Sequence, residues 1–170
     1  MNIRLLIACA LALSVSACAT LQQYEAANDI RALLISIRDT DQAAFDAHVD
    51  KPALKAQLRA VATAEALKRK DQLGALGAVL AGPLVDIIVD RYLRPEVFLA
   101  VAEADGYSPD RPIPNAALLT PLIRPLDAEH ACVTTKQGGP CAFLFRKEAS
   151  VWKLVAFQGD PRTLKLNLRL

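Results

Sequence analysis

The chain has 170 residues, a formal net charge of +2 and 53% hydrophobic residues, although only 5% of its residues are aromatic. This length fits one ordinary domain with a sizeable core, built mostly from Leu, Val, Ile and Ala. The near-zero charge gives no sign of the concentrated basic face of a nucleic-acid-binding protein, so we expect no nucleic acid among its partners.

The first 18 residues have the three parts of a lipoprotein leader. Arg4 and the amino terminus supply positive charge, residues 5–15 form an apolar run of 11, and two small residues stand before Cys18. A run of this length is too short for a transmembrane helix, which needs about 20 residues. The stretch Leu-Ser-Val-Ser-Ala-Cys that ends at Cys18 is similar to a lipobox, the cleavage and lipidation signal of bacterial lipoproteins. An ordinary secretory signal, in which Cys18 has no special role, is the alternative.

The lipobox predicts a signal peptide at residues 1–17 and a lipid anchor, with palmitate among its acyl chains, on Cys18. The 170 residues less these 17 leave 153, which form a single predicted domain, residues 18–170. Arg4 is removed with the leader, so 19 of the 20 Lys and Arg residues remain against 18 acidic ones. Ala19 is not the acidic residue associated with inner-membrane retention, so the resemblance implies the outer membrane, with the domain facing the periplasm.

The mature chain begins with two predicted helices. Apolar residues at helical spacing predict the first over residues 20 to about 37. Asp39-Thr40-Asp41 then breaks the pattern and offers N-caps for a short second helix, Gln42–Val49.

A third helix is predicted after Asp50, which is its expected cap, and runs to about Lys70. Pro52 falls in its first turn, where a missing N–H costs nothing. The residues expected to face inward on this helix are Leu54, Leu58, Val61 and Leu67.

Residues 73–93 are the most apolar stretch of the mature chain. Gly82-Pro83 interrupts this stretch, which predicts two short helices that meet there. A membrane-inserting hairpin and a buried helical hairpin are the two interpretations. Pieces of about 10 residues are too short to span a bilayer, and aspartates within it would be costly in hydrocarbon. We therefore expect five apolar side chains to pack inside the domain: Leu76, Val79, Leu84, Ile87 and Ile88.

Asp86 and Asp90 form the one acidic pair that could carry chemistry. At positions i and i+4 they share a helix face. As a functional pair they would act as a general acid/base couple or half of a cation site. As a structural pair they mark the solvent side of an amphipathic helix, ion-paired with Arg91 or Arg94, and this is the role we expect.

The chain changes character after a further predicted helix, Pro95 to about Ala104. Residues 105–116 are rich in proline and turn formers and form a predicted linker between a helical half, residues 20–104, and a strand half, residues 117–170. The predicted strands are Ala117–Ile123, His130–Thr135, Cys141–Arg146 and Val151–Phe157, with a fifth at the alternating tail Leu164–Leu170. Helices followed by an antiparallel meander of four or five strands predict an α+β domain, with the helices packed on one face of the sheet.

Two of the four cysteines are left for a disulfide, because Cys9 leaves with the leader and Cys18 takes the lipid. Cys132 and Cys141 are therefore the predicted disulfide of a protein in an oxidising compartment. If they face each other directly, they share a face of the sheet with Phe143. The spacing matches no zinc site, and the chain's two histidines, His48 and His130, are not at metal-binding spacings. We predict no catalytic residues, no metal and no cofactor.

Three segments resemble one family. They are residues 44–58, 73–96 and 141–157, with a Val-Asp-x-Pro-x-Leu step from Val49, paired Val-Asp dipeptides at 85–86 and 89–90, and a closing Trp-Lys-Leu at 152–154. Together they are similar to the bacterial membrane-associated proteins of domain of unknown function 2939. The resemblance implies a fold and a location, and it implies no activity or catalytic residues.

The sequence favours a non-catalytic, lipid-anchored binding or interaction module at the periplasmic face of the outer membrane. Its expected partners are the membrane, through lipidated Cys18, and an envelope protein, polymer or lipid. The alternative is a carrier of a small apolar molecule or lipid, because helices over a sheet can enclose an aliphatic pocket. An enzyme ranks third.

Overall fold

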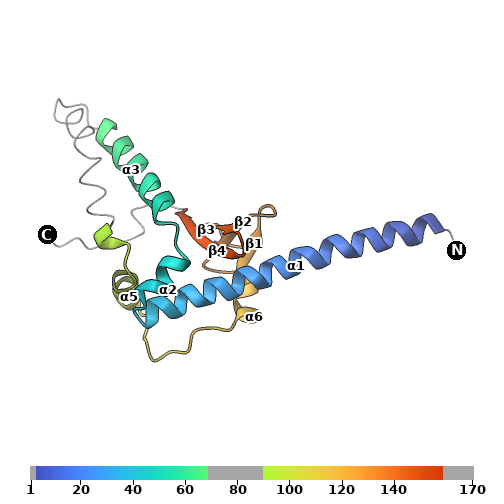
Figure 1. Ribbon diagram of the computed structural model, residues 1–170, viewed down its shortest axis with the longest axis horizontal. Helices are drawn as coiled ribbons and strands as arrows, with labels where there is room; N and C mark the ends of the chain where they lie inside the picture. The colour runs from blue at the N-terminus through green and yellow to red at the C-terminus, as the bar shows by residue number, and fades with distance from the viewer. Residues whose placement is uncertain (1–2, 69–89, 159–170) are drawn as a thin grey trace.

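The computed structural model describes residues 3–68 and 90–158, with its side-chain description beginning at Thr20. Helices from the N-terminal half pack against a C-terminal antiparallel sheet (Figure 1). The predicted α+β class is confirmed. The predicted buried hairpin, with Leu76, Val79, Leu84, Ile87 and Ile88, and the predicted tail strand, Leu164–Leu170, lie outside the described residues.

Helix α1 spans Ile3–Arg38 and is the longest element. The sequence predicted a helix from residue 20, and the structure continues it back through the leader, whose Leu and Ala residues favour helix. Thr40, with a φ of 53°, follows the end of the helix. One face of α1 is buried through small and aliphatic residues at helical spacing, Ala26, Ala27, Ile30 and Leu33. The two alanines allow the helix to approach the sheet closely.

Two aspartates cap the next helices as the sequence predicted. Helix α2, Gln42–Ala47, begins after Asp41, whose side chain accepts a hydrogen bond of 3.0 Å from the Ala44 N–H. Helix α3, Lys51–Lys68, begins after Asp50, whose side chain accepts one of 2.9 Å from the Ala53 N–H. The predicted end of the second helix at Val49 is wrong. Val49 instead forms a parallel bridge with Leu154 at the edge of the sheet.

The inward face predicted for α3 is only partly correct. Leu54 is fully buried, but Leu58, one turn later, is 36% exposed. Val61 is half-buried, and the side chain of Leu67 lies outside the described residues. Figure 1 shows the reason: α3 leaves the body of the domain after its first turns, so an apolar position further along has less to pack against.

Helix α5 spans Pro95–Ala104, as predicted, with proline in its first turn. Gly106 follows with a φ of 92°, a left-handed conformation that glycine adopts without strain. The linker that follows α5 was predicted as residues 105–116, but it ends one residue earlier, because α6 begins at Ala116.

The predicted strand Ala117–Ile123 is wrong. The structure has a short helix, α6 (Ala116–Leu119), then a 3₁₀ turn, η1 (Thr120–Leu122), and only then strand β1 (Ile123–Pro125). Asn115 decides the helix, because its side chain caps α6 by accepting a hydrogen bond of 3.0 Å from the Leu118 N–H.

The sheet contains four antiparallel strands in the order β1-β2-β3-β4. Strands β2 (His130–Thr134), β3 (Cys141–Glu148) and β4 (Val151–Phe157) lie close to their predicted positions. The turn between β2 and β3 contains Gly138 with a φ of 70°, and the turn between β3 and β4 contains Ala149 with a φ of 55°.

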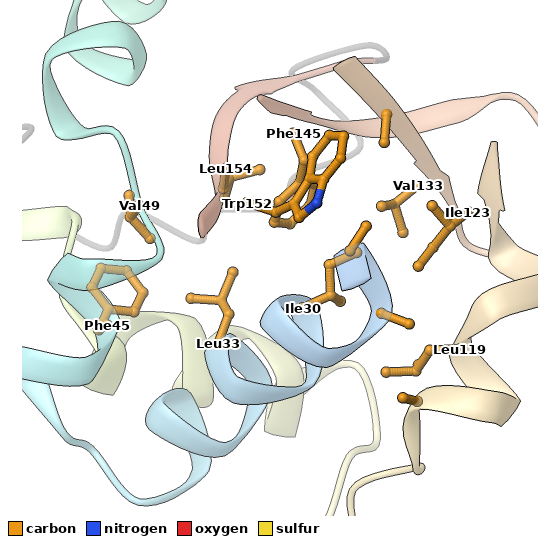
Figure 2. Close-up of a cluster of buried hydrophobic side chains, with 14 of the residues drawn as sticks. Ile30, Leu33, Phe45, Val49, Leu119, Ile123, Val133, Phe145, Trp152 and Leu154 are labelled. Carbon is orange, nitrogen blue, oxygen red and sulfur yellow. The ribbon is translucent and has the colours of Figure 1, made fainter. Parts of the chain in front are cut away.

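The core lies between α1 and one face of the sheet (Figure 2). Trp152 of β4 is fully buried in the middle of the cluster, among side chains from α1 and the sheet, and Phe45 of α2 is fully buried at one end of it. The helices and strands that meet here contribute Ile30, Leu33, Val49, Leu119, Ile123, Val133, Phe145 and Leu154.

Candidate functional site

The end of the domain nearest Cys18 is fixed by two adjacent glutamines. Gln22 donates a side-chain hydrogen bond of 2.5 Å to the Asp127 carbonyl, and Gln23 donates one of 2.9 Å to the Ile123 carbonyl. These carbonyls bracket β1, so α1 is attached to the sheet from the fourth residue after Cys18. The part of α1 that precedes this attachment extends beyond the body of the domain (Figure 1).

Three large apolar or aromatic side chains are exposed at the same end. Leu21 is 61% exposed, Tyr24 49% and Leu126 52%. Leu21 and Tyr24 are three residues apart on α1, on the side opposite Ala26 and Ile30. Leu126 precedes Asp127, the residue that bonds Gln22. We call Leu21, Tyr24 and Leu126 the apolar rim.

The turn beside the apolar rim is organised by Asp127. Its carboxylate accepts hydrogen bonds of 2.8 Å from the backbone N–H groups of Glu129 and His130 and lies 3.0 Å from His130 Nδ1. These contacts, the Glu129 N–H first, hold the pKa of Asp127 below its usual value. His130, one of the two histidines considered above, therefore helps to shape a turn.

Cys132 and Cys141 form a disulfide, as predicted, with 5.5 Å between their Cα atoms. They are not directly opposed, because Thr134 pairs with Cys141 and Leu144 pairs with Cys132. The register shifts after Val133, and this irregularity turns Cys141 away from the face of Phe143. The disulfide lies on the face of the sheet away from α1, since Ala131 and Val133, the neighbours of Cys132, both point into the core.

His48 lies at the junction of α1, α2 and β4. Its Nδ1 lies 2.8 Å from the Ala44 carbonyl, and its Nε2 lies 3.7 Å from Asp29 Oδ1. The other oxygen of Asp29, Oδ2, accepts a hydrogen bond of 2.8 Å from the backbone N–H of Trp152. Asp29 first, and then the Ala44 carbonyl, raise the pKa of His48, while partial burial and Lys153 act against them.

The backbone on both sides of Val49 continues this junction. The Leu154 N–H donates to the His48 carbonyl and the Asp50 N–H donates to the Leu154 carbonyl, each at 2.9 Å. The segment after α2 therefore pairs with β4 at a single parallel bridge, outside the four strands of the sheet. Because Asp29 and His48 are both committed to this docking, the arrangement is suited to holding α1, α2 and β4 together, and it can respond to pH.

A charged network lies beside this junction. Arg146 contacts Asp50 at 2.8 Å and Glu148 at 2.6 Å, and Lys153 contacts Glu148 at 2.9 Å. Lys153 first, and then Arg146, hold the pKa of Glu148 below its usual value. The Glu148 carboxylate raises the pKa of Arg146 in turn. The network joins the N-cap of α3 to the sheet.

Lys147 covers the buried tryptophan on the side of the helices. Its ammonium lies 2.7 Å from Glu25 of α1 and 5.9 Å from the centroid of the Trp152 ring. An ammonium at this distance from an indole is attracted by the ring's electron-rich face. The contact gives α1 and β3 a polar link at the margin of the core.

The acidic pair considered above is only half described. Asp90 is exposed and forms an ion pair of 2.6 Å with Lys55 of α3, rather than with Arg91 or Arg94. Asp86 lies outside the described residues. Asp90 therefore has an ion-pair partner on α3, and the structural role of the Asp86 and Asp90 pair stays a prediction.

Residues 3–68 and 90–158 contain neither a metal-binding cluster nor a membrane-spanning helix. In these ranges no three His, Cys, Asp or Glu side chains gather as they would around a metal ion. None of the helices there is long and apolar enough to cross a membrane.

The junction around Asp29 and His48 had no signal in the sequence. Asp29 is an ordinary charged residue of an amphipathic helix, and its partner Trp152 lies 123 positions later in the chain. His48 offered one weak hint, because a histidine at the end of a short helix can contact the last carbonyls of that helix. The apolar rim had one weak local signal, because Leu21 and Tyr24 fall on the side of the helix opposite Ile30, but nothing in the sequence brings Leu126 to the same end.

A family model described as "Protein of unknown function (DUF2939)" matches residues 7–101. The match contains two of the segments that carry the resemblance, residues 44–58 and 73–96, and the third, residues 141–157, lies beyond it. No curated protein and no solved structure matches the chain.

Proposed function

The chain belongs to the DUF2939 family of proteins of unknown function, and we propose that it is a lipid-anchored, non-catalytic binding or interaction module of the bacterial cell envelope. In this proposal residues 1–17 are a cleaved signal peptide, Cys18 carries the lipid, and the domain faces the periplasm from the outer membrane. Its partner is an envelope protein, polymer or lipid.

The observation that carries the proposal is the position of the lipobox relative to the folded domain. The motif ends at Cys18, and Gln22, four residues later, already donates a hydrogen bond to the Asp127 carbonyl just after β1. The lipidation signal therefore stands directly at the border of the domain, where a membrane anchor can act without disturbing the core.

Within residues 3–68 and 90–158, the packed core supports an interaction module over a carrier. A lipid carrier of this fold class would be expected to hold its ligand between helices and sheet. That space is occupied by fully buried side chains, of which Trp152 and Phe45 are the largest. A surface partner agrees better with this packing than an enclosed ligand.

Metabolic labelling with palmitate tests the anchor, using Cys18→Ser and the matched control Cys9→Ser. Both cysteines lie in the first 18 residues, but only Cys18 is in the lipobox. The wild type and Cys9→Ser should incorporate label and fractionate with the outer membrane, and Cys18→Ser should not be labelled. Equal labelling of all three chains would refute the anchor.

Native mass spectrometry of the protein extracted from its own envelope tests the partner. A stoichiometric protein or envelope fragment supports the interaction module. A stoichiometric lipid that stays bound after exchange into lipid-free detergent, and that is distinct from the covalent anchor, supports the carrier instead.

A further inference from the structure

We propose that the domain docks on the bilayer surface through the apolar rim, with Leu21, Tyr24 and Leu126 in contact with the phospholipids. This inference rests on the lipid anchor at Cys18 proposed above. It adds a second, non-covalent contact with the membrane, and it gives the domain a fixed orientation on that membrane.

The tether between the anchor and the domain is very short. Gln22 and Gln23 already bond to the carbonyls that bracket β1. Four residue steps separate Cys18 from Gln22, about 6 Å as a helix and at most about 14 Å if fully extended. The polar layer of one leaflet is itself about 5–8 Å thick. The end of the domain beside Cys18 is therefore held at the level of the headgroups.

The side chains at that end have the chemistry that a membrane surface binds. Leu21 and Tyr24 are well exposed on the face of α1 opposite its core contacts, and Leu126 is brought to the same level by the bond between Gln22 and Asp127. Exposed aliphatic side chains next to an anchor gain by entering the headgroup and acyl boundary. A tyrosine places its apolar ring there while its hydroxyl stays hydrated.

Charge at the rim favours an apolar contact over an electrostatic one. Asp127 and Glu129 are exposed in the adjacent turn and would repel anionic headgroups. Asp127 is committed to two backbone N–H groups, and its lowered pKa keeps it ionised. The partner is therefore the interfacial region of the bilayer itself, and docking should occur on zwitterionic lipid and be insensitive to salt.

A depth measurement on the acylated protein tests the docking. The mature protein is reconstituted in phosphatidylcholine vesicles, and a single cysteine is introduced and labelled with the fluorophore NBD. No native thiol competes, because Cys132 and Cys141 are bonded to each other and Cys18 is acylated. The rim variants are Leu21→Cys and Leu126→Cys. The matched control is Leu58→Cys, an exposed leucine on α3, which lies away from the emerging start of α1 (Figure 1).

Docking predicts that lipids carrying a nitroxide quencher at the upper acyl chain reduce the fluorescence of both rim labels at least twofold more than that of the label at position 58. Equal, weak quenching at all three positions, on protein that floats with the vesicles and has an acylated Cys18, overturns the docking and leaves the proposed anchor standing. Failure to float, together with an unmodified Cys18, overturns both. Circular dichroism of each labelled variant confirms that its fold is unchanged.

Discussion

Asp29 should be the most informative residue of the junction between α1, α2 and β4, because its two oxygens do different things. Oδ2 accepts a hydrogen bond of 2.8 Å from the backbone N–H of Trp152, and Oδ1 lies 3.7 Å from His48 Nε2. Asp29→Ala removes both contacts and leaves a partly buried N–H without its acceptor, which should cost about 1–3 kcal/mol of unfolding free energy. For a domain of this size the loss corresponds to a fall of about 2–12 °C in melting temperature.

Asp29→Asn separates the two contacts. Its side-chain oxygen can still accept the Trp152 N–H, but the negative charge that faces His48 is gone. Above the pKa of His48, where the imidazole is neutral, the asparagine should cost less than about 1 kcal/mol. Any larger cost should appear only where His48 is protonated.

The pH dependence follows from the raised pKa of His48. A histidine whose pKa is higher in the folded state than in the unfolded state, about 6.5, contributes stability that is fully present below the unfolded value. This contribution is lost as the pH rises through the folded pKa. The unfolding free energy of the wild type should therefore exceed that of Asp29→Asn by more at about pH 5.5 than at about pH 8.5.

The assay is urea unfolding of residues 19–170 at both pH values, monitored by the fluorescence of Trp152, the chain's only tryptophan. The wild type, Asp29→Asn and Asp29→Ala are compared. If the two variants lose the same free energy at both pH values, neither the shared-carboxylate geometry nor the charge on His48 matters to stability. Asp29 would then not link Trp152 and His48 in the way that the distances indicate.

Two further predictions concern the sheet and α3. Titration of the unfolded, unreduced protein should find no free thiol from Cys132 or Cys141, and reduction of their disulfide should lower stability by about 2–3 kcal/mol in the chain-entropy model; two reactive thiols would contradict the bond. Leu54→Ala should destabilise by about 2–5 kcal/mol as a core truncation. Leu58→Ala, one turn later on the same face of α3 but 36% exposed, should change stability by much less, about 0.5 kcal/mol; equal losses would show that Leu58 is packed after all.

Features with a local cause could be predicted from the sequence. Asp41 and Asp50 cap their helices through side-chain bonds that span three residues. Strand β4 was predicted at its observed bounds, because the side chains of Val151–Phe157 follow a strand-like pattern and the segment is flanked by turn-forming residues on both sides. The disulfide was found by elimination, since only Cys132 and Cys141 were left.

Features that depend on distant parts of the chain could not be predicted from the sequence. The segment before β1 contains apolar residues that fit a strand, and Asn115 decides for a helix instead. Leu58 has an inward spacing, but its burial depends on how far the sheet extends beside α3. The register shift after Val133 sets the face of the disulfide, and strand spacing alone assumes a regular ladder. The candidate site follows the same division: the lipobox is a local motif, whereas the apolar rim requires Leu126 to meet α1 across about a hundred residues.

The lipid anchor is tested most directly by the mass of the N-terminal peptide from protein extracted from its native envelope. We predict that this peptide begins at Cys18 and carries acyl chains that hydroxylamine removes in part, since ester-linked chains are labile and an amide-linked chain is not. A peptide that begins at Met1, or one that begins at or near Cys18 with an unmodified thiol, would contradict the anchor and with it the proposed placement of the domain on the membrane.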